Sequence, residues 1–285
     1  MFRKNIKHAD IDSDPDRSLA DSADRHVLYQ QSVQDVEAEI DFVEQTWSEL
    51  RQRPAILLRE DFCGTANTAC EWIVRDEIHQ AIGVDLDREV LDWGYSNNLS
   101  QLEEEQQERI ELLNEDVLQT RPGPADIILA MNFSYYLFLT RDDLRDYFEN
   151  LLDGLVSDGI LFLDAYGGYE APMVLTEPRE CQDADGNEFT YIWDQAVFNP
   201  IDSCMTCHIH FEFPDKSRME KAFSYHWRLW TLPELREILF EAGFSAVDIY
   251  WEGTDEVKNE GNGIYMPSET GDADPGWVCY IVAQA

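Results

Sequence analysis

Short apolar runs recur along this chain, and segments with helical periodicity lie between most of them. The runs cover residues 55–58, 81–84, 110–113, 127–131, 160–163, 247–251 and 277–283. Between them, apolar side chains recur every three or four residues, for example at Leu144, Phe148, Leu151 and Leu155. Strands that alternate with helices in this way form a largely parallel sheet with helices on both faces. We therefore predict an α/β chain with a doubly wound sheet.

Two regions depart from the alternation. Residues 188–198, 205–213 and 222–230 are three alternating runs with no helix between them, separated by the turn sequences NPIDS and PDKS. They predict an inserted antiparallel sheet. Residues 252–276 are read as a long acidic loop before the last strand. Residues 36–50 predict a long helix, whereas residues 8–24 show no period and are expected to be loosely packed.

The charge balance limits the partners of this protein. Asp and Glu number 58 against 21 Lys and Arg, which gives a net charge of −37. Such a surface repels phosphate backbones, so a nucleic-acid partner is disfavoured. The acidity fits either a salty cytoplasm or a cationic partner or substrate, and composition alone does not separate the two. A homodimer is left open.

The segment MFRKNIKHADIDSD lacks the apolar centre of a secretory signal, and no stretch reaches the length of a membrane span. The six cysteines are scattered through the chain and are expected to be reduced. We therefore expect a cytoplasmic protein without a membrane partner.

The turn after the first predicted strand, REDFCGTA, is the default place for a cofactor in an open α/β sheet. Of the positions where a dinucleotide loop has glycine, only one is filled by glycine, at Gly64. Glu60 and Asp61 lead into the turn, and two carboxylates suit a cation better than a phosphate.

Further acidic residues follow the next two strands. Asp85 ends the second strand about twenty residues after the turn, where a carboxylate usually accepts from ribose hydroxyls. Asp87 lies beside it, and Asp116 follows the third strand, in position to accept from an adenine amino group. A cationic, adenosine-bearing cofactor without phosphates fits this set, and S-adenosylmethionine is the candidate.

In these motifs the sequence resembles the class I S-adenosylmethionine-dependent methyltransferases over residues 50–165 and 230–285. REDFCGTA is similar to the first motif of that family, with Glu60 at the acid and Phe62, Gly64 and Ala66 at its three glycines. GVDLD, NEDV and DIILAMNFSYYL resemble the next three motifs. The resemblance implies a Rossmann-like seven-stranded sheet of order 3-2-1-4-5-7-6, with an antiparallel last strand.

The resemblance also implies a division of the chain and a set of cofactor contacts. Residues 1–50 would form an N-terminal segment and lid helix, residues 51–165 and 231–285 the core, and residues 166–230 the insert that covers a small-molecule pocket. Tyr29 and Arg59 are candidates to bind the cofactor carboxylate. The other predicted cofactor contacts are Glu60, Cys63, Gly64, Asp85, Leu86, Asp116, Val117, Met131 and Asn132.

The methyl acceptor is expected above the fourth and fifth strands. Ser134, Tyr136, Tyr166, Arg228 and Tyr265 are the candidate substrate contacts. Tyrosine rings are able to surround a cation. Tyr135 and His226 are the candidate catalytic residues, with His226 as a general base if it faces the pocket. Each tyrosine is equally well explained as a core residue.

Parts of the sequence allow other interpretations. CMTCHIH invites a metal site, but Cys204, His208 and His210 share one face of a strand while Cys207 lies on the other, and no second C-x-x-C is present. We predict a plain strand without a metal. The competing functions are a non-catalytic S-adenosylmethionine-binding protein, an NAD-dependent oxidoreductase and an aminopropyl transferase.

Overall fold

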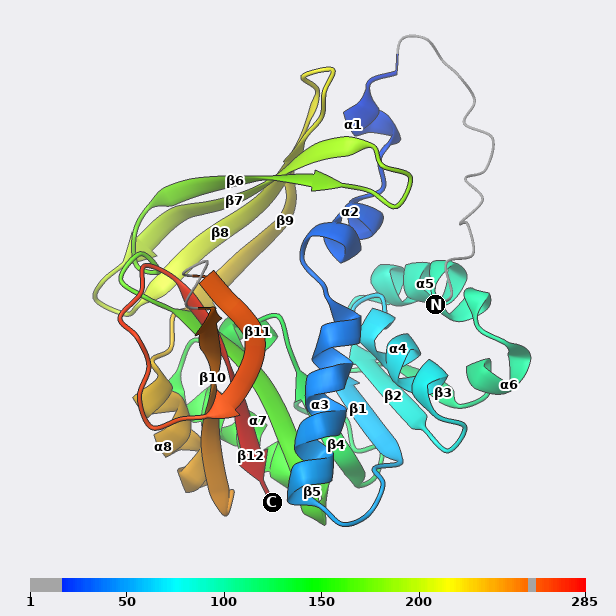
Figure 1. Cartoon of the computed structure of the whole chain (residues 1–285), viewed down its shortest axis with the longest axis vertical. Helices are drawn as coiled ribbons and strands as arrows, with labels where there is room; N and C mark the ends of the chain where they lie inside the picture. The colour runs from blue at the N-terminus through cyan, green and yellow to red at the C-terminus, as the bar shows by residue number, and fades with distance from the viewer. Residues whose placement is uncertain (1–16, 256–259) are drawn as a thin grey trace.

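The protein is described by a computed structural model over residues 17–255 and 260–285 (Figure 1). Its main sheet has eight strands in the order β11-β10-β12-β5-β4-β1-β2-β3. The strands are β1 (Leu57–Asp61), β2 (Gln80–Asp85), β3 (Ile110–Asn114), β4 (Ala125–Ala130), β5 (Leu155–Gly167), β10 (Ala246–Asp255), β11 (Glu260–Pro267) and β12 (Trp277–Gln284).

The strand order confirms the predicted topology. β1 to β5 pair in parallel, and β12 pairs antiparallel with both β5 and β10. β12 and β10 thus take the places of the seventh and sixth strands. β11 is an addition at the edge, formed inside the segment that was expected to be an acidic loop. That expectation is corrected.

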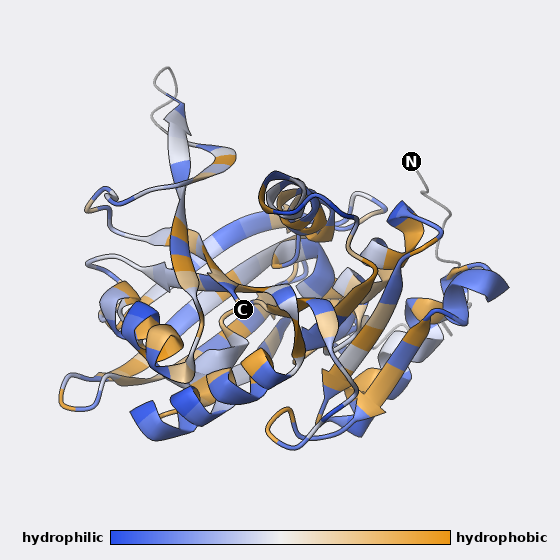
Figure 2. Ribbon diagram, turned by 90° about the horizontal axis from the view of Figure 1, so that it is seen from below, coloured by the Kyte–Doolittle hydropathy of each residue, from blue (hydrophilic) through white to orange (hydrophobic). Residues whose placement is uncertain are grey.

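Helices cover both faces of the sheet, as the alternation predicted. The helices α3 (Val36–Leu50), α4 (Asn67–Arg75) and α5 (Arg88–Asn97) pack on one face, and α7 (Arg141–Asp153) and α8 (Leu232–Ala242) pack on the other. Two apolar cores result, and Figure 2 shows the apolar residues along the strands between helices with polar outer surfaces. In the described residues no helix is long and apolar enough to cross a membrane.

Helix boundaries follow from local chemistry. Thr231 and Glu234 form a capping box at the start of α8, and Gly243, at φ +110°, ends that helix. Shorter helical segments are α1 (Leu19–Ser22), α2 (Arg25–Ser32), α6 (Glu104–Gln107), η1 (Leu99–Gln101) and η2 (Ser134–Leu137). α1 lies inside the segment 8–24 that was expected to be loosely packed, and it buries none of its residues. The part of that segment before residue 17 is outside the described residues.

The insert is a separate antiparallel sheet of order β6-β7-β8-β9. Its strands are β6 (Leu175–Gln182), β7 (Glu188–Asn199), β8 (Cys204–Glu212) and β9 (Arg218–Arg228). The three predicted runs correspond to β7, β8 and β9, whereas β6 was not predicted. The sheet lies beyond the carboxyl ends of the parallel strands, on the same side as α2 (Figure 1).

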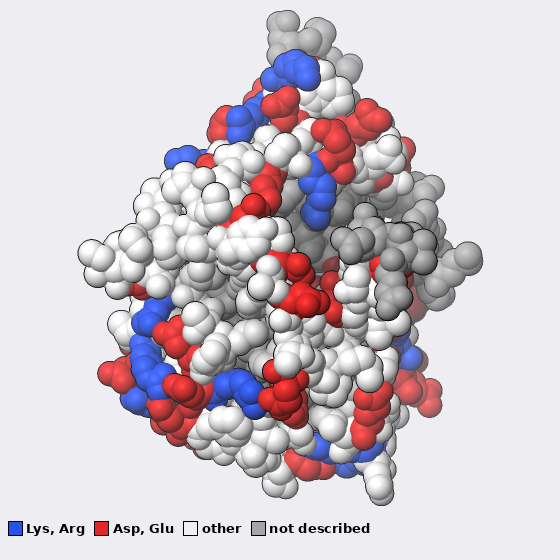
Figure 3. Space-filling model, turned by 60° about the vertical axis from the view of Figure 1, so that its left-hand side comes forward, with Lys and Arg blue, Asp and Glu red and all other residues white. Residues whose placement is uncertain are grey.

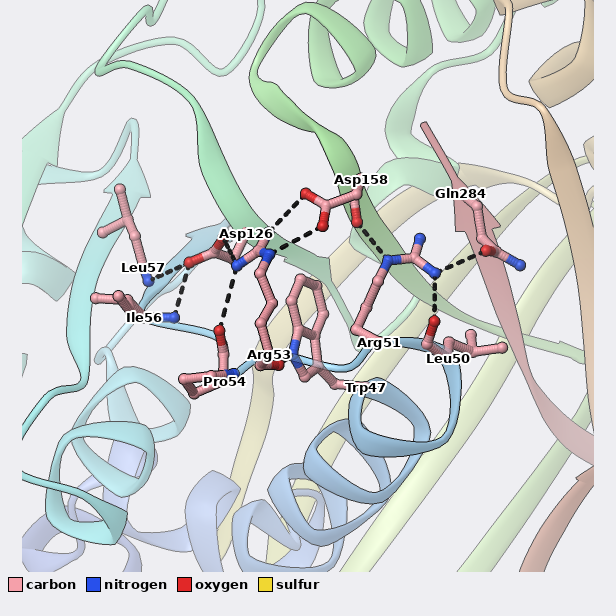
Figure 4. Close-up of polar contacts among 10 residues, drawn as sticks. All are labelled: Trp47, Leu50, Arg51, Arg53, Pro54, Ile56, Leu57, Asp126, Asp158 and Gln284. Atoms are coloured by element: carbon pink, nitrogen blue, oxygen red, sulfur yellow. Dashed lines mark hydrogen bonds and ion pairs between the residues drawn. The ribbon is translucent and has the colours of Figure 1, made fainter.

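At the opposite end of the sheet, polar contacts hold the end of α3 (Figure 4). Arg53 forms a two-point ion pair with Asp158 and a further one with Asp126, at 2.7 Å, while its guanidinium lies 4.9 Å from the Trp47 ring. Asp126 also accepts from the backbone amides of residues 56 and 57, at 2.7 and 3.0 Å. These contacts, which we call the Arg53 clamp, tie α3 to β1, β4 and β5.

Candidate cofactor and acceptor site

The turn between β1 and α4 has a left-handed backbone conformation at three positions, which is the conformation that glycine adopts most easily. Phe62, Gly64 and Ala66 all have left-handed φ angles, of +57°, +53° and +55°. For a residue other than glycine this conformation costs roughly 1–2 kcal/mol. Only one of these three positions is a glycine, yet all three have the φ angles that favour glycine. The Phe62 ring packs behind the turn, 5.7 Å from the Tyr147 ring.

The outer side of the turn is open. A Cβ placed on Gly64 would meet no atom within 4 Å. The Gly64 amide donates to Asp85 Oδ2 at 2.8 Å, and Asp85 Oδ1 accepts from the Asp87 amide at 2.9 Å. The carboxylate at the end of β2 therefore fixes the turn after β1, and its burial raises its pKa. Leu86, 72% exposed, lies at the surface beside it.

Three carboxyl groups gather near the turn. Glu60 accepts from the Ala69 amide at 3.0 Å at the start of α4, and Glu39, on α3, accepts from the Thr68 hydroxyl at 3.4 Å. Asp164, on β5, accepts from two backbone amides at the end of β4, both at 2.8 Å. Asn132 and Phe133, which supply those amides, have left-handed φ angles of their own.

Within residues 17–255 and 260–285, these carboxyl groups have no ion-pair partner of positive charge. Burial raises the pKa of Glu39 and Glu60 to about 8 and that of Asp164 to about 7. Repulsion from Asp164 and Glu60 raises the pKa of Glu39 further. Among the ion pairs of the described residues, none joins a lysine or arginine to any of the three. A bound cation is therefore favoured beside the turn.

The helix α2 connects the turn with the insert. Gln30 donates to the Thr65 hydroxyl at 2.8 Å, and Asn67, at the start of α4, donates to Gln34 at 3.3 Å. On its other side, the ring of Tyr29 packs 4.9 Å from that of Phe223 on β9. The segment before α3 thus spans the gap between the two sheets.

A cavity of about 660 Å³ lies between the two sheets and next to α2. We call it the inter-sheet cavity. Its floor is formed by residues at the ends of β4, β5, β10, β11 and β12, and its roof by the facing side of the insert. Four of the residues predicted for the site line it, Tyr29, Asn132, Tyr166 and Tyr265. In Figure 3, acidic side chains line a hollow near the middle of the face shown.

Arg59 does not reach this region, which corrects its prediction as a cofactor contact. Its side chain is fully buried on the sheet face covered by α7, where Nε lies 2.6 Å from Asp61 Oδ1. The Tyr147 hydroxyl donates to the same carboxylate at 3.0 Å. Because successive residues of a strand point to opposite faces, Glu60 and Arg59 cannot both face the turn.

Three residues after β4 are also corrected. Tyr135 and Tyr136 are fully buried in η2, and their hydroxyls donate to the backbone oxygens of Asp164 and Tyr166 at 2.8 and 3.2 Å. The Ser134 hydroxyl donates to the Met131 carbonyl at 2.8 Å. None of the three lines the inter-sheet cavity. These side chains support the floor rather than form it.

His226 and Arg228 are corrected as well, because they lie on the outer face of the insert. Tyr225 and Trp227 line the cavity, so the residues between and after them point away. His226 is exposed. Arg228 pairs with Glu234 at 3.0 Å and stacks 3.7 Å from the Trp230 ring.

The remaining predicted contacts are placed as follows. Asp116 follows β3, where its carboxylate accepts from the Leu118 amide at 3.0 Å. Val117, Met131 and Cys63 are buried. Val117 follows Asp116 directly, Met131 follows β4, and Cys63 belongs to the turn between β1 and α4. Their contacts with a cofactor stay predictions.

Several residues of the site were not predicted. Glu39 lies on a helix whose sequence indicated only an apolar stripe, and Asp164 sits inside a strand, in LFLDAYGG. A carboxylate within an otherwise apolar strand was the one signal available for Asp164, since a buried charge needs a reason. For Glu39 no comparable signal exists in a sequence rich in glutamate.

The sequence matches no protein-family model and no curated protein sequence. Solved structures do match the fold. A S-adenosylmethionine-dependent methyltransferase from Clostridium acetobutylicum has a TM-score of 0.65 and 16% identity over 90% of this chain and 96% of that one. An amino pentose methyltransferase from Micromonospora echinaspora, with S-adenosylmethionine bound, has a TM-score of 0.64 and 13% identity over 91% and 95%. A sugar N-methyltransferase from a Streptoalloteichus species has a TM-score of 0.62 and 13% identity over 92% of both chains.

Proposed function

We propose that this chain, which has the fold of the class I S-adenosylmethionine-dependent methyltransferases, is itself a methyltransferase that acts on a small molecule. The observation that carries the proposal is the set of carboxyl groups beside an open turn that form no ion pair with a lysine or arginine of the described residues. The methionyl end of S-adenosylmethionine carries an ammonium, a sulfonium and one carboxylate, so its net charge is positive, and the two cationic groups suit Glu39, Glu60 and Asp164. A diphosphate would be repelled there, which disfavours a dinucleotide cofactor.

The other parts of the site suit the rest of that cofactor. Asp85 and Asp116 stand at the ends of neighbouring strands and have lone pairs left for ribose and adenine. Bound there, S-adenosylmethionine supplies a methyl group already activated for displacement. The chain then has to position the acceptor and exclude water. α2 spans the gap above the turn, and we assign it the role of a lid.

The inter-sheet cavity supplies the place for the acceptor. Its volume of about 660 Å³ falls within the range typical of small-molecule sites. Two neighbours of known structure are described as acting on an amino pentose and on a sugar. A small-molecule acceptor is therefore the assignment that both the cavity and the fold support.

Calorimetry with S-adenosylhomocysteine and with NADH tests the proposal. We expect S-adenosylhomocysteine to bind and NADH not to bind. Gly64→Ala should weaken the binding at least tenfold, about 1.4 kcal/mol, because its Cβ enters the open space and φ is +53°. Gly186→Ala is the control, since Gly186 has a φ of +85°, an open surrounding and a position in the β6–β7 turn.

Binding of NADH in place of S-adenosylhomocysteine would contradict the proposal. So would equal losses of affinity in the two glycine variants, because backbone strain alone would then explain the result.

A further inference from the structure

From the inter-sheet cavity we infer the chemical class of the acceptor, an organic amine without phosphate groups that is bound through its nitrogen. The inference rests on the proposed function, since it identifies the substrate of the same site. Three features of the cavity carry it: its facing aromatic rings, its carboxylates, and the arrangement of basic residues around it.

Aromatic side chains form the roof of the cavity. Trp193, Tyr225 and Trp227 extend from β7 and β9 toward the main sheet. Tyr225 and Trp227 stack at 4.3 Å, and Trp193 lies 6.1 Å from Trp227. This surface is continuous, and a π-face attracts a cation by about 0.5–2 kcal/mol.

A second aromatic group faces the roof from the floor. Tyr166, Trp277 and Tyr265 come from β5, β12 and β11. Gly167 makes this arrangement possible, because any Cβ there would collide with the Trp277 ring. Rings above and below a cavity surround a ligand, which is the arrangement that recognises substituted ammonium groups.

The charged residues of the cavity are all acidic. Glu170, Glu177 and Glu252 line it, and no lysine, arginine or histidine does so among the described residues. Arg179, further along β6, does not line the cavity: it donates to the Ser32 carbonyl and stacks 5.0 Å from the ring of Tyr191, a lining residue. A phosphate in the cavity would face carboxylates without a countercharge, whereas an ammonium would be stabilised.

Amine chemistry also fits the bases that are present. When an amine nitrogen attacks the sulfonium methyl, an N–C bond forms, the C–S bond breaks and its electron pair stays on sulfur. The positive charge passes to nitrogen, inside the aromatic walls. An amine that binds as its ammonium first gives a proton to a cavity carboxylate or to water, because only the neutral amine has the lone pair for this attack. An N–H that remains after the attack loses its proton in the same way. An alcohol would instead need a stronger base than a carboxylate, and His226 faces away.

The test compares two ligands of the same shape. Choline and 3,3-dimethyl-1-butanol differ by a nitrogen in place of a carbon, so their difference in affinity reports on charge. Calorimetry is done on the full chain in ~1 M NaCl, where the screening length is about 3 Å and the overall negative charge contributes little. We expect choline to bind at least tenfold more tightly, and phosphocholine to bind more weakly than choline.

Matched variants locate the effect. Glu177→Gln should weaken choline at least threefold and leave dimethylbutanol unchanged. Glu180→Gln removes the same charge from the opposite face of β6 and should change neither affinity, because Glu180 pairs with Thr190 outside the cavity. Trp277→Phe should keep most of the choline affinity, whereas Trp277→Leu should lose it, since only phenylalanine retains a π-face.

The inference is overturned if choline does not bind, if dimethylbutanol binds equally well, or if the two glutamate variants weaken choline equally. S-adenosylhomocysteine binding separates it from the proposed function. Binding of S-adenosylhomocysteine without choline would refute the amine acceptor alone. Selective choline binding without S-adenosylhomocysteine would refute the methyltransferase and, with it, the assignment of the cation as acceptor.

Discussion

Glu39, Glu60 and Asp164 are the acidic groups of the site, and burying them in the ionised form opposes folding. Each has a pKa above its usual range, about 8 for the glutamates and about 7 for the aspartate, because it is buried. The folded chain therefore holds protons that the unfolded chain has already released between about pH 5 and pH 8. A group of this kind stabilises the fold at low pH and does so less as the pH rises.

We predict that the free energy of unfolding falls as the pH is raised from about 5 to about 8. Glu39→Gln should flatten this dependence, because it removes one raised carboxyl group and its repulsion of Glu60. Glu37→Gln, on the exposed side of the same helix, should leave the slope unchanged. Urea unfolding at several pH values measures the slope of the free energy of unfolding against pH. A stability that rises over this range would contradict the assignment of these groups as buried acids.

The residue types of the turn were predictable, but the directions of many side chains were not. The acids at strand ends follow from topology, so Glu60 and Asp85 were placed correctly beside the turn. The insert strand alternates, and its sequence does not say whether Trp227 or His226 faces inward; the core takes the tryptophan because burying it removes more apolar surface. Tyr135 and Tyr136 turned inward for the same reason, in a helical turn that the sequence did not indicate.

At the scale of elements, the Arg53 clamp sets where α3 lies. The clamp holds the carboxyl end of α3 at the end of the sheet opposite the turn. Glu39, near the amino end of the same helix, then lies beside the turn. Of the two carboxylates that hold Arg53, Asp126 is the more buried, with 11% of its side chain exposed against 48% for Asp158. Only Asp126 also accepts from backbone amides of the segment that enters β1.

We predict that Asp126→Ala lowers the free energy of unfolding by about 2–4 kcal/mol, because it removes the more buried of the two carboxylates that pair with Arg53 and leaves two backbone amides without their acceptor. Asp158→Ala should cost about 1 kcal/mol or less, since that pair is half-exposed. Chemical denaturation of the two variants measures the difference. Equal losses would show that burial does not govern the clamp.

Two strands escaped prediction for a shared physical reason. β6, with the sequence LTEPRECQ, and β11, with EGNGIYMP, both lie at the edge of a sheet. An edge strand needs no continuous apolar face and tolerates proline and glycine, so the alternation that identifies inner strands is absent. The inner strands of both sheets bury at least one face and were visible in the sequence for that reason.

At the scale of the whole molecule, the net charge of −37 dominates. Acidic side chains are spread over the face shown in Figure 3, and the mutual repulsion of the acidic residues is relieved when the chain unfolds and expands. Two different effects of salt are separable by concentration. Screening acts mainly while the Debye length shrinks from about 30 Å at 0.01 M to about 10 Å at 0.1 M, whereas salting-out grows at molar concentrations.

We predict that the melting temperature rises steeply with NaCl below about 0.3 M and more slowly above it, because screening removes the repulsion first. The rise should shrink near pH 5, where carboxyl groups begin to take up protons and the net charge is smaller. Differential scanning calorimetry over both variables tests this. A melting temperature that ignores salt, or one that rises only at molar concentrations, would mean that self-repulsion does not limit stability. The acidity would then be better explained by a cationic ligand such as the amine proposed for the inter-sheet cavity.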